Sequence, residues 1–227
     1  MSPAVAVLDA GKTHTRVALV TPAGEEIAAR RMATPMRRDG PYPAEDVDAL
    51  WPFVRDALAD FARAHAIRAI VPVAHGSAAA LVGPEGLVLP VMDYESPLPE
   101  EAAGYGALRP GFAETGSPDQ PGGLNLGRQL YWLQSRFTDA FARAEAMLPL
   151  PQYWAWRLSG VAAAEVTSLG AQSDLWASRE GRASRLVRRC GWERLIPPIR
   201  AAWEVLGPIR PEVAAETGLD PATPVLA

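Results

Sequence analysis

The sequence predicts an α/β domain in which a mixed β-sheet is flanked by helices. Three observations carry this prediction. Short apolar runs separated by turn residues open the chain, a long amphipathic segment follows, and a β-branched run comes directly after that segment. The order strand, strand, strand, helix, strand is typical of proteins in which a crossover helix returns the chain to a central, buried strand. We expect residues 1–227 to form one such domain.

The first elements follow from apolar spacing and turn residues. The chain passes from an initial apolar run through Asp-Ala-Gly into a second run, which a Thr-Pro-Ala-Gly turn closes. Apolar residues at intervals of three and four then predict a helix. The elements expected, in order, are strands at 5–8, 16–20 and 27–32, an amphipathic helix within 43–65, and a buried strand at 68–73.

The remainder of the chain alternates a hairpin, a punctuated segment and helices. A Gly-Pro-Glu-Gly turn predicts a hairpin within 77–92, and the glycine and proline residues of 96–123 predict a long loop or an insertion. Further apolar periodicity predicts helices, the last of which ends at Gly160. The helices expected lie at 124–137, 140–148 and 151–158, and residues 224–227 begin an apolar strand.

Composition excludes several classes of function. The 227 residues are 48% hydrophobic and 21% charged, which is enough apolar material for a folded core. Twenty-two basic residues stand against 26 acidic ones, so a nucleic-acid-binding surface is not expected. A single cysteine, Cys190, excludes an internal disulfide and a cysteine-rich zinc site. The sequence contains no long uncharged apolar run, so neither a membrane span nor a secretion signal is predicted. We therefore expect a cytoplasmic protein without membrane contact.

The segment DAGKTHTR at 9–16 is a candidate phosphate site. Its Gly-Lys-Thr triplet suggests a P-loop, but Ala6 stands where that motif requires a glycine. What remains is a carboxylate at a strand end, a glycine in a tight turn and the hydroxyls of Thr13 and Thr15. Backbone N–H groups of such a turn cradle phosphate oxygens, and Asp9 can hold magnesium directly or through water. An ordinary hairpin with an Asx-type turn fits the same residues.

A second candidate is His75, which with Gly76 follows the buried strand. Strand ends that open into glycine are where α/β proteins build ligand sites, although a structural histidine is the alternative. Ser77 lies too close to His75 in sequence to form a nucleophile and base pair, and no Gly-x-Ser-x-Gly elbow occurs. A dinucleotide fingerprint is also absent, because Arg109 occupies the third glycine position of the pattern that begins at Gly104.

A third candidate is the polar segment at 164–176. Its side chains suit the binding of hydroxyl groups, and Trp176 offers a stacking wall, while a capped loop between helices is the alternative. Trp154 and Trp156 would also suit a sugar site. Tryptophan among apolar residues is, however, usually part of a core.

Taken in order, three stretches resemble the N-terminal domain of the FGGY family of carbohydrate kinases, in the actin-like ATPase superfamily. Residues 9–16 resemble the family's first phosphate motif, Asp-x-Gly-x-Thr-x-x-Arg or Lys. VPVAHG at 71–76, with the hairpin after it, resembles the Gln-x-His-Gly strand near the sugar pocket. LPLPQYW at 148–154, with Leu-Ser-Gly and Glu-Val-Thr-Ser further on, resembles the Pro-Asp-Tyr-Leu, Leu-Thr-Gly and Asp-x-Thr/Ser stretch.

The variants of these motifs place the chain nearest one branch of the family. Gly-Lys-Thr in the phosphate motif, and Thr-Ser-Leu-Gly followed by Asp-Leu-Trp, look closest to L-fuculose and L-rhamnulose kinases. Two positions depart from the family pattern: Ala74 replaces a polar or sulfur-containing residue, and Gln152 stands where an acid is common. Both departures bear on the identity of the sugar.

The resemblance implies a ribonuclease-H-like fold and the ATP- and Mg²⁺-dependent phosphorylation of a sugar hydroxyl. Asp9 is expected to orient phosphate and to be the magnesium ligand, and Arg16 is expected to be structural. The resemblance assigns phosphate binding to Asp9, Gly11, Lys12, Thr13 and Thr15. It assigns sugar binding to His75, Gly76, Glu165 and Thr167.

The resemblance covers only the first of the two domains of such kinases. The catalytic base, an aspartate in a glycine-rich turn, is expected beyond Ala227, so that no catalytic residue and no activity are expected of this chain alone. Its expected partners are a small-molecule sugar, ATP and the missing C-terminal kinase domain. Two alternatives stay open: a non-catalytic sugar-binding or regulatory half-domain, whose exposed sheet would favour a homodimer, and an actin-like fragment without a ligand.

Overall fold

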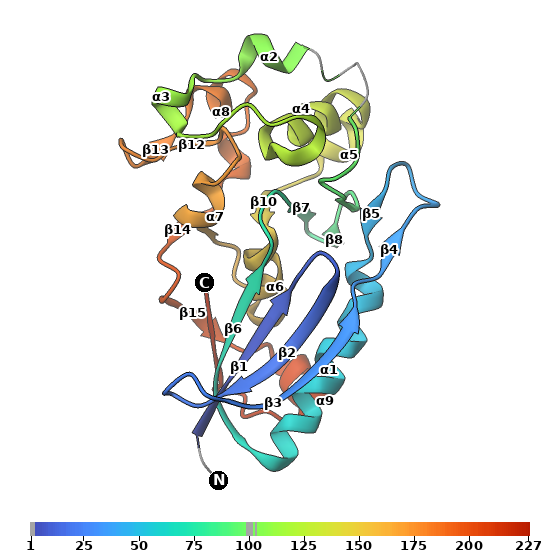
Figure 1. The fold of residues 1–227 in the computed structure, drawn as a ribbon, viewed down its shortest axis with the longest axis vertical. Helices are drawn as coiled ribbons and strands as arrows, with labels where there is room; N and C mark the ends of the chain where they lie inside the picture. Colours follow the sequence, from blue (N-terminus) through green and yellow to red (C-terminus); the bar gives the residue numbers. More distant parts are fainter. Residues whose placement is uncertain (1–2, 99–101, 103) are drawn as a thin grey trace.

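The computed structural model describes residues 3–98, 102 and 104–227. It has two lobes, one built on a large sheet and the other on short helices and short sheets (Figure 1). Each lobe has its own cluster of buried apolar side chains. No helix among the described residues is both long enough and apolar enough to pass through a bilayer.

The large sheet is mixed. β1 pairs antiparallel with β2 and parallel with β6, and β6 pairs parallel with β16. This arrangement confirms the mixed sheet and the crossover that the sequence predicts, including the final apolar strand. In order across the sheet, the strands are β15 (Val205–Pro208), β16 (Pro224–Leu226), β6 (Ala66–Ala74), β1 (Pro3–Ala10), β2 (His14–Val20) and β3 (Glu26–Ala33).

Three helices cover one face of this sheet (Figure 1). They are α1 (Val47–Ala64), α6 (Leu150–Ser159) and α9 (Pro211–Thr217). Every second residue of β1 points into the cluster that they form, because side chains alternate between the faces of a strand. Asp46 begins α1 by accepting a hydrogen bond from the N–H of Ala49 at 3.0 Å. Gly160 ends α6 at φ 81°, as the sequence predicts.

The second lobe combines four small sheets with short helices. Its strand groups are β10 (Ala146–Pro149), β7 (Ala79–Gly83) and β8 (Gly86–Leu87); β4 (Met36–Arg37), β5 (Ala44–Glu45) and β9 (Val91–Met92); β11 (Ala164–Glu165) and β14 (Ile199–Arg200); and β12 (Trp176–Ala177) and β13 (Arg182–Ala183). Its α-helices are α2 (Tyr105–Leu108), α3 (Phe112–Thr115), α4 (Leu126–Arg136), α5 (Thr138–Ala142), α7 (Val166–Gly170) and α8 (Arg185–Arg189). The 3₁₀ turns at Gly122–Leu124 and Glu193–Leu195 also belong to it.

Two expected helices have different bounds in the structure. The expectation of a helix over 140–148 is wrong in its second half, because α5 ends at Ala142 and β10 follows, paired antiparallel with β7. All four residues of β10 are buried, and periodicity alone does not separate a short buried strand from a buried helix. The helix expected within 43–65 begins only at Val47, because the residues before its cap form β5.

Candidate functional site

The turn between β1 and β2 is tightly closed. The N–H of Gly11 donates to the carbonyl oxygen of His14 at 3.1 Å, and the hydroxyl of Thr34 donates to the carbonyl oxygen of Gly11 at 2.6 Å. A Cβ atom on Gly11 would lie 2.7 Å from the His14 oxygen, so the turn requires glycine there. Thr13 is exposed beside this turn. Thr15 is fully buried with its hydroxyl 3.1 Å from that of Thr34, so it contributes to the shape of the turn.

Asp9 is suited to a cation. It is the last residue but one of β1 and an exposed carboxylate, and no ion pair engages it within the described part of the chain. The same residues contain no group of three or more acidic, histidine or cysteine side chains that would hold a metal by themselves. Mg²⁺ commonly binds through one or two carboxylates together with phosphate oxygens and water. The chemistry of Asp9 thus agrees with a magnesium ligand, and that role stays a prediction.

His75 lies directly beside the end of β1, because its N–H donates to the carbonyl oxygen of Ala10 at 3.3 Å. Its imidazole Nε2 is 2.6 Å from the Glu45 carboxylate, and its Nδ1 is 2.9 Å from the carbonyl oxygen of Gly76. Both neighbours are acceptors, so this arrangement favours the doubly protonated, cationic imidazole.

Electrostatics agree with this geometry. Burial lowers the pKa of His75, but the hydrogen bond to Glu45 and the charge of that carboxylate together outweigh burial, so that the pKa lies above its usual 6.5. Glu45 itself is 5% exposed. Sequence analysis missed Glu45, because it stands directly before the cap of α1 and was included in the expected helix. No sequence signal links two residues thirty positions apart.

Lys12 connects the β1–β2 turn to His75. Its ammonium group forms an ion pair with the carboxylate of Asp93 and lies 5.1 Å from the centre of the Tyr94 ring. The His75 ring lies 5.1 Å from the same tyrosine ring, centre to centre. Two predicted site residues that are far apart in sequence therefore share one aromatic side chain. We call Lys12, Glu45, His75, Asp93 and Tyr94 the His75 cluster.

Glu165 and Thr167 lie elsewhere in the second lobe. The Glu165 carboxylate accepts hydrogen bonds from the N–H of Thr167 at 3.0 Å and of Ser168 at 3.1 Å, and thereby caps α7. Thr167 lines a pocket of about 730 Å³ together with Trp176. Within the described residues, no hydrogen bond or ion pair joins Glu165 or Thr167 to the His75 cluster, so their sugar-binding role stays a prediction.

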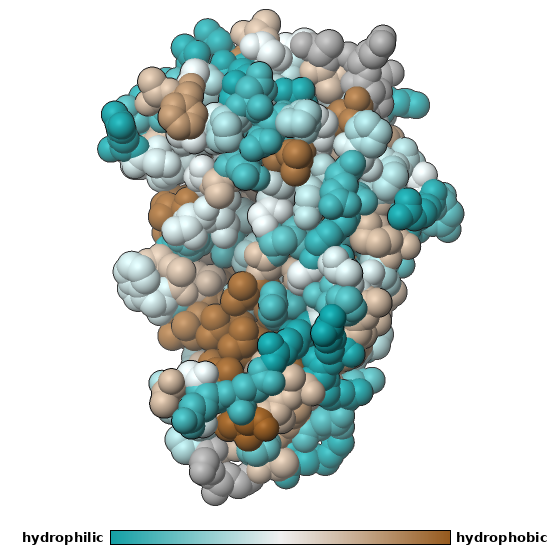
Figure 2. All heavy atoms as spheres, in the orientation of Figure 1, coloured by the Kyte–Doolittle hydropathy of each residue, from teal (hydrophilic) through white to brown (hydrophobic). Residues whose placement is uncertain are grey.

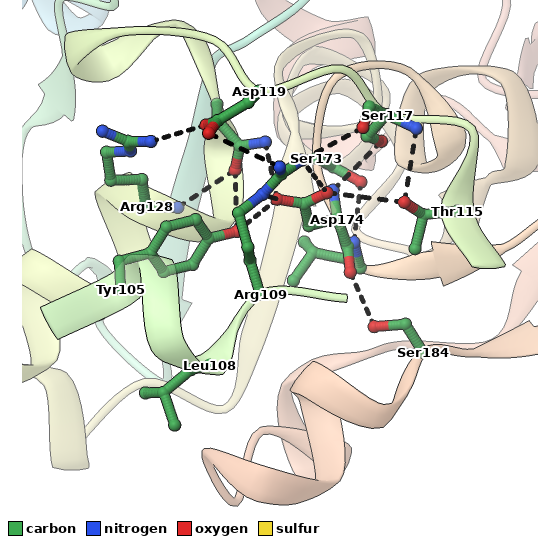
Figure 3. Close-up of polar contacts among 12 residues, drawn as sticks. Tyr105, Leu108, Arg109, Thr115, Ser117, Asp119, Arg128, Ser173, Asp174 and Ser184 are labelled. Carbon is green, nitrogen blue, oxygen red and sulfur yellow. Dashed lines mark hydrogen bonds and ion pairs between the residues drawn. The ribbon is translucent and has the colours of Figure 1, made fainter. Parts of the chain in front are cut away.

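A buried carboxylate organises the second lobe (Figure 3). Oδ2 of Asp174 accepts hydrogen bonds from the Tyr105 hydroxyl at 2.7 Å, from Nε of Arg109 at 3.0 Å and from Nδ2 of Asn125 at 2.9 Å. Nη2 of Arg109 donates to Oδ1 at 3.2 Å, which makes this a two-point ion pair. Asp174 thus fixes the 105–117 segment to the start of α4.

Solved structures of carbohydrate kinases resemble the whole chain. A carbohydrate kinase from Novosphingobium aromaticivorans is 38% identical with a TM-score of 0.94, and the match covers 100% of this chain and 48% of that one. A xylulose kinase from Lactobacillus acidophilus is 18% identical with a TM-score of 0.84, covering 99% and 47%. A Plasmodium falciparum glycerol kinase with ADP is 10% identical with a TM-score of 0.82, covering 100% and 48%.

These comparisons show the fold and its extent. The mixed sheet with its flanking helices matches the actin-like ATPase fold of sugar kinases, as the sequence predicts. The chain spans about half the length of the kinases that it matches. No family model and no curated protein matches the sequence.

Proposed function

We propose that this chain is the N-terminal, sugar-binding half of an ATP-dependent carbohydrate kinase of the FGGY family. The observation that carries the proposal is the common position of the phosphate turn and His75 at the ends of two adjacent strands, joined through Lys12 and Tyr94. A kinase must bring phosphate and sugar hydroxyl together, and this arrangement supports that juxtaposition. The 38% identical carbohydrate kinase, which the chain covers by half, supports it further.

The phosphate side of the proposed site is the β1–β2 turn. Backbone N–H groups of the turn, with Gly11, Lys12 and Thr13, bind phosphate oxygens. Asp9 would hold magnesium, which would offset negative charge on the phosphoryl group. Lys12 forms an ion pair with Asp93, and we propose that its ammonium group turns from this carboxylate to a phosphate oxygen when a nucleotide binds.

The sugar side is the segment at 75–76. The charged imidazole of His75 donates to a sugar oxygen, Glu45 holds the ring by its other nitrogen, and the exposed Gly76 leaves space for the ligand. Proton removal from the sugar hydroxyl belongs to a base outside residues 1–227, in a C-terminal kinase domain. We therefore propose that this chain binds sugar but transfers no phosphate. Three expectations stay predictions: that the chain is cytoplasmic, that it forms a homodimer, and that it belongs to the L-fuculose and L-rhamnulose kinase branch.

Calorimetric titration of the purified 227-residue chain tests the proposal. The panel is D-xylulose, D-gluconate, glycerol, L-fuculose and L-rhamnulose, each with and without Mg²⁺-ADP. We expect at least one of them to bind, and we expect His75→Ala to abolish that binding while His65→Ala, at the other end of β6, preserves it. The absence of binding by every member of the panel would overturn the proposal. Sugar-dependent ADP formation from ATP that Asp9→Ala abolishes would overturn the proposed inactivity.

A further inference from the structure

We infer that Ser77 and Gln172 form a second hydroxyl-binding wall beside His75 and determine which sugar the chain accepts. This inference rests on the proposed function, because it concerns the same sugar site. The hydroxyl of Ser77 donates to Oε1 of Gln172 at 2.9 Å, across 95 positions of sequence. Ser77 follows His75 by two residues, so the Cα atoms of the two residues lie at most about 7 Å apart.

The hydrogen-bonding groups that this pair leaves unused suit a polyol. Oε1 of Gln172 is occupied by Ser77, while no described residue accepts a hydrogen bond from its amide nitrogen, which carries two protons. Gln172 is exposed and Ser77 is 8% exposed. The pair therefore offers the two amide protons of the exposed Gln172 beside a largely buried Ser77 hydroxyl, whereas both ring nitrogens of His75 already have partners.

The backbone at both residues is held in an unfavourable conformation. Ser77 has φ 60° and Gln172 has φ 53°, and Asp174 is the third and last non-glycine residue with positive φ in the described ranges. Such left-handed backbone is costly for side chains other than glycine, asparagine and aspartate, and it concentrates at ligand sites. We infer that the hydroxyl of Ser77 and the amide of Gln172 are the reason that residues other than glycine stand at these two positions.

The fold holds this pair in place from α4. The first N–H groups of α4, on Leu126 and Gly127, donate to the carbonyl oxygens of Gln172 at 3.1 Å and Ser173 at 2.9 Å. Nε2 of Gln129 donates to the carbonyl oxygen of Ser77 at 2.7 Å. A Cβ on Gly127 would lie 2.6 Å from the Ser173 oxygen, so glycine permits this close approach. Asp174, two residues after Gln172, is fixed by the buried polar cluster of Figure 3.

Replacement of Gln172 by glycine separates binding from folding. Glycine accepts positive φ without strain, so Gln172→Gly is expected to keep or raise the melting temperature while it removes the amide. We expect the sugar that binds wild type most tightly to bind about tenfold more weakly, and the differences in Kd across the sugar panel to narrow. Ser77→Gly is expected to act in the same direction. Ser135→Ala, an exposed hydroxyl on α4, is the control and is expected to leave every Kd unchanged.

The possible results separate this inference from the function on which it rests. If wild type binds a sugar and Gln172→Gly binds every member of the panel within twofold of wild type, the inference is wrong and the proposed function stands. If His75→Ala and Gln172→Gly both weaken binding of the same sugar, both are supported. If wild type binds no member of the panel, both are overturned.

Discussion

Replacement of Asp174 by alanine tests whether one buried carboxylate holds the second lobe together. The Asp174 side chain is fully buried and pairs with Arg109, whose side chain is 15% exposed. Removing one member of a buried ion pair costs about 3–5 kcal/mol, because the other charge stays buried without a partner. Alanine at φ 60° adds about 1 kcal/mol of backbone strain. Together these are about 4–6 kcal/mol, which for a chain of this length lowers the melting temperature by about 8–24 °C.

Arg109 also offers a matched control. Its second carboxylate partner, Asp119, is 65% exposed and lies 3.6 Å from Nη1. Asp119 also pairs with Arg128 at 2.9 Å, and exposed pairs contribute at most about 1 kcal/mol each, so Asp119→Ala is expected to lower the melting temperature by less than about 8 °C. Asp174→Asn keeps the volume and tolerates positive φ, and is expected to fall between the two. Melting is followed by tryptophan fluorescence and by circular dichroism. A shift for Asp174→Ala no larger than that for Asp119→Ala would refute the reasoning.

Three further predictions concern the proposed site. Because the pKa of His75 is raised in the folded state, the stabilisation by its pair with Glu45 is complete below about pH 6.5 and is lost as the pH rises through the folded pKa. The difference in urea midpoint between wild type and Glu45→Gln should therefore shrink as the pH rises over that range. A difference that stays constant with pH would contradict this prediction. Gly11→Ala should lower the free energy of unfolding by about 1–3 kcal/mol, because its added Cβ clashes with the His14 carbonyl oxygen. Gly76→Ala should leave it unchanged, because no atom lies within 4 Å of the added Cβ. Equal melting temperatures for the two variants would contradict this prediction. Asp9→Ala should leave the melting temperature of the free chain unchanged and remove any stabilisation by Mg²⁺-ADP; a large loss of stability without ligand would show a structural carboxylate.

Local patterns account for the part of the fold that sequence analysis predicted. Alternating apolar residues in β1 and β2, helical spacing in α1 and the glycine that ends α6 are all readable within one element. β10 was mistaken for helix because a short, fully buried apolar run carries no period of its own. The short helices α2 and α3 lie in the segment of many glycines and prolines, where local signals predict only a loop.

The candidate site was predictable only in part for a different reason. Its phosphate turn and His75 lie at strand ends, and strand ends are visible in the sequence. Glu45 and Gln172 reach their partners from positions 30 and 95 residues away, and single-sequence reasoning has no access to such pairs. Asp174 was noted only as one polar residue among several, because nothing local indicates its burial with Arg109.

The space-filling view shows a further property of the sheet lobe. Apolar residues gather on the sheet face opposite the three helices (Figure 2). Val73 is 44% exposed and Val205 is 59% exposed on the strands of that lobe. This surface agrees with the proposal that a second kinase domain accompanies the chain, since apolar patches of this kind commonly mark interaction sites.

The central proposal is that sugar and phosphate bind at the adjacent ends of β1 and β6, and the three histidines of the chain allow its most direct test. His75 lies at the sugar side, His14 follows the phosphate turn, and His65 is at the opposite end of β6, next to the last residue of α1. Imidazole signals of the 227-residue chain are followed by NMR during titration with the sugar panel and with Mg²⁺-ADP. We predict that a sugar moves the His75 signal, that Mg²⁺-ADP moves the His14 signal, and that His65 stays unchanged. Signals of His75 and His14 that remain fixed with every ligand would contradict the account.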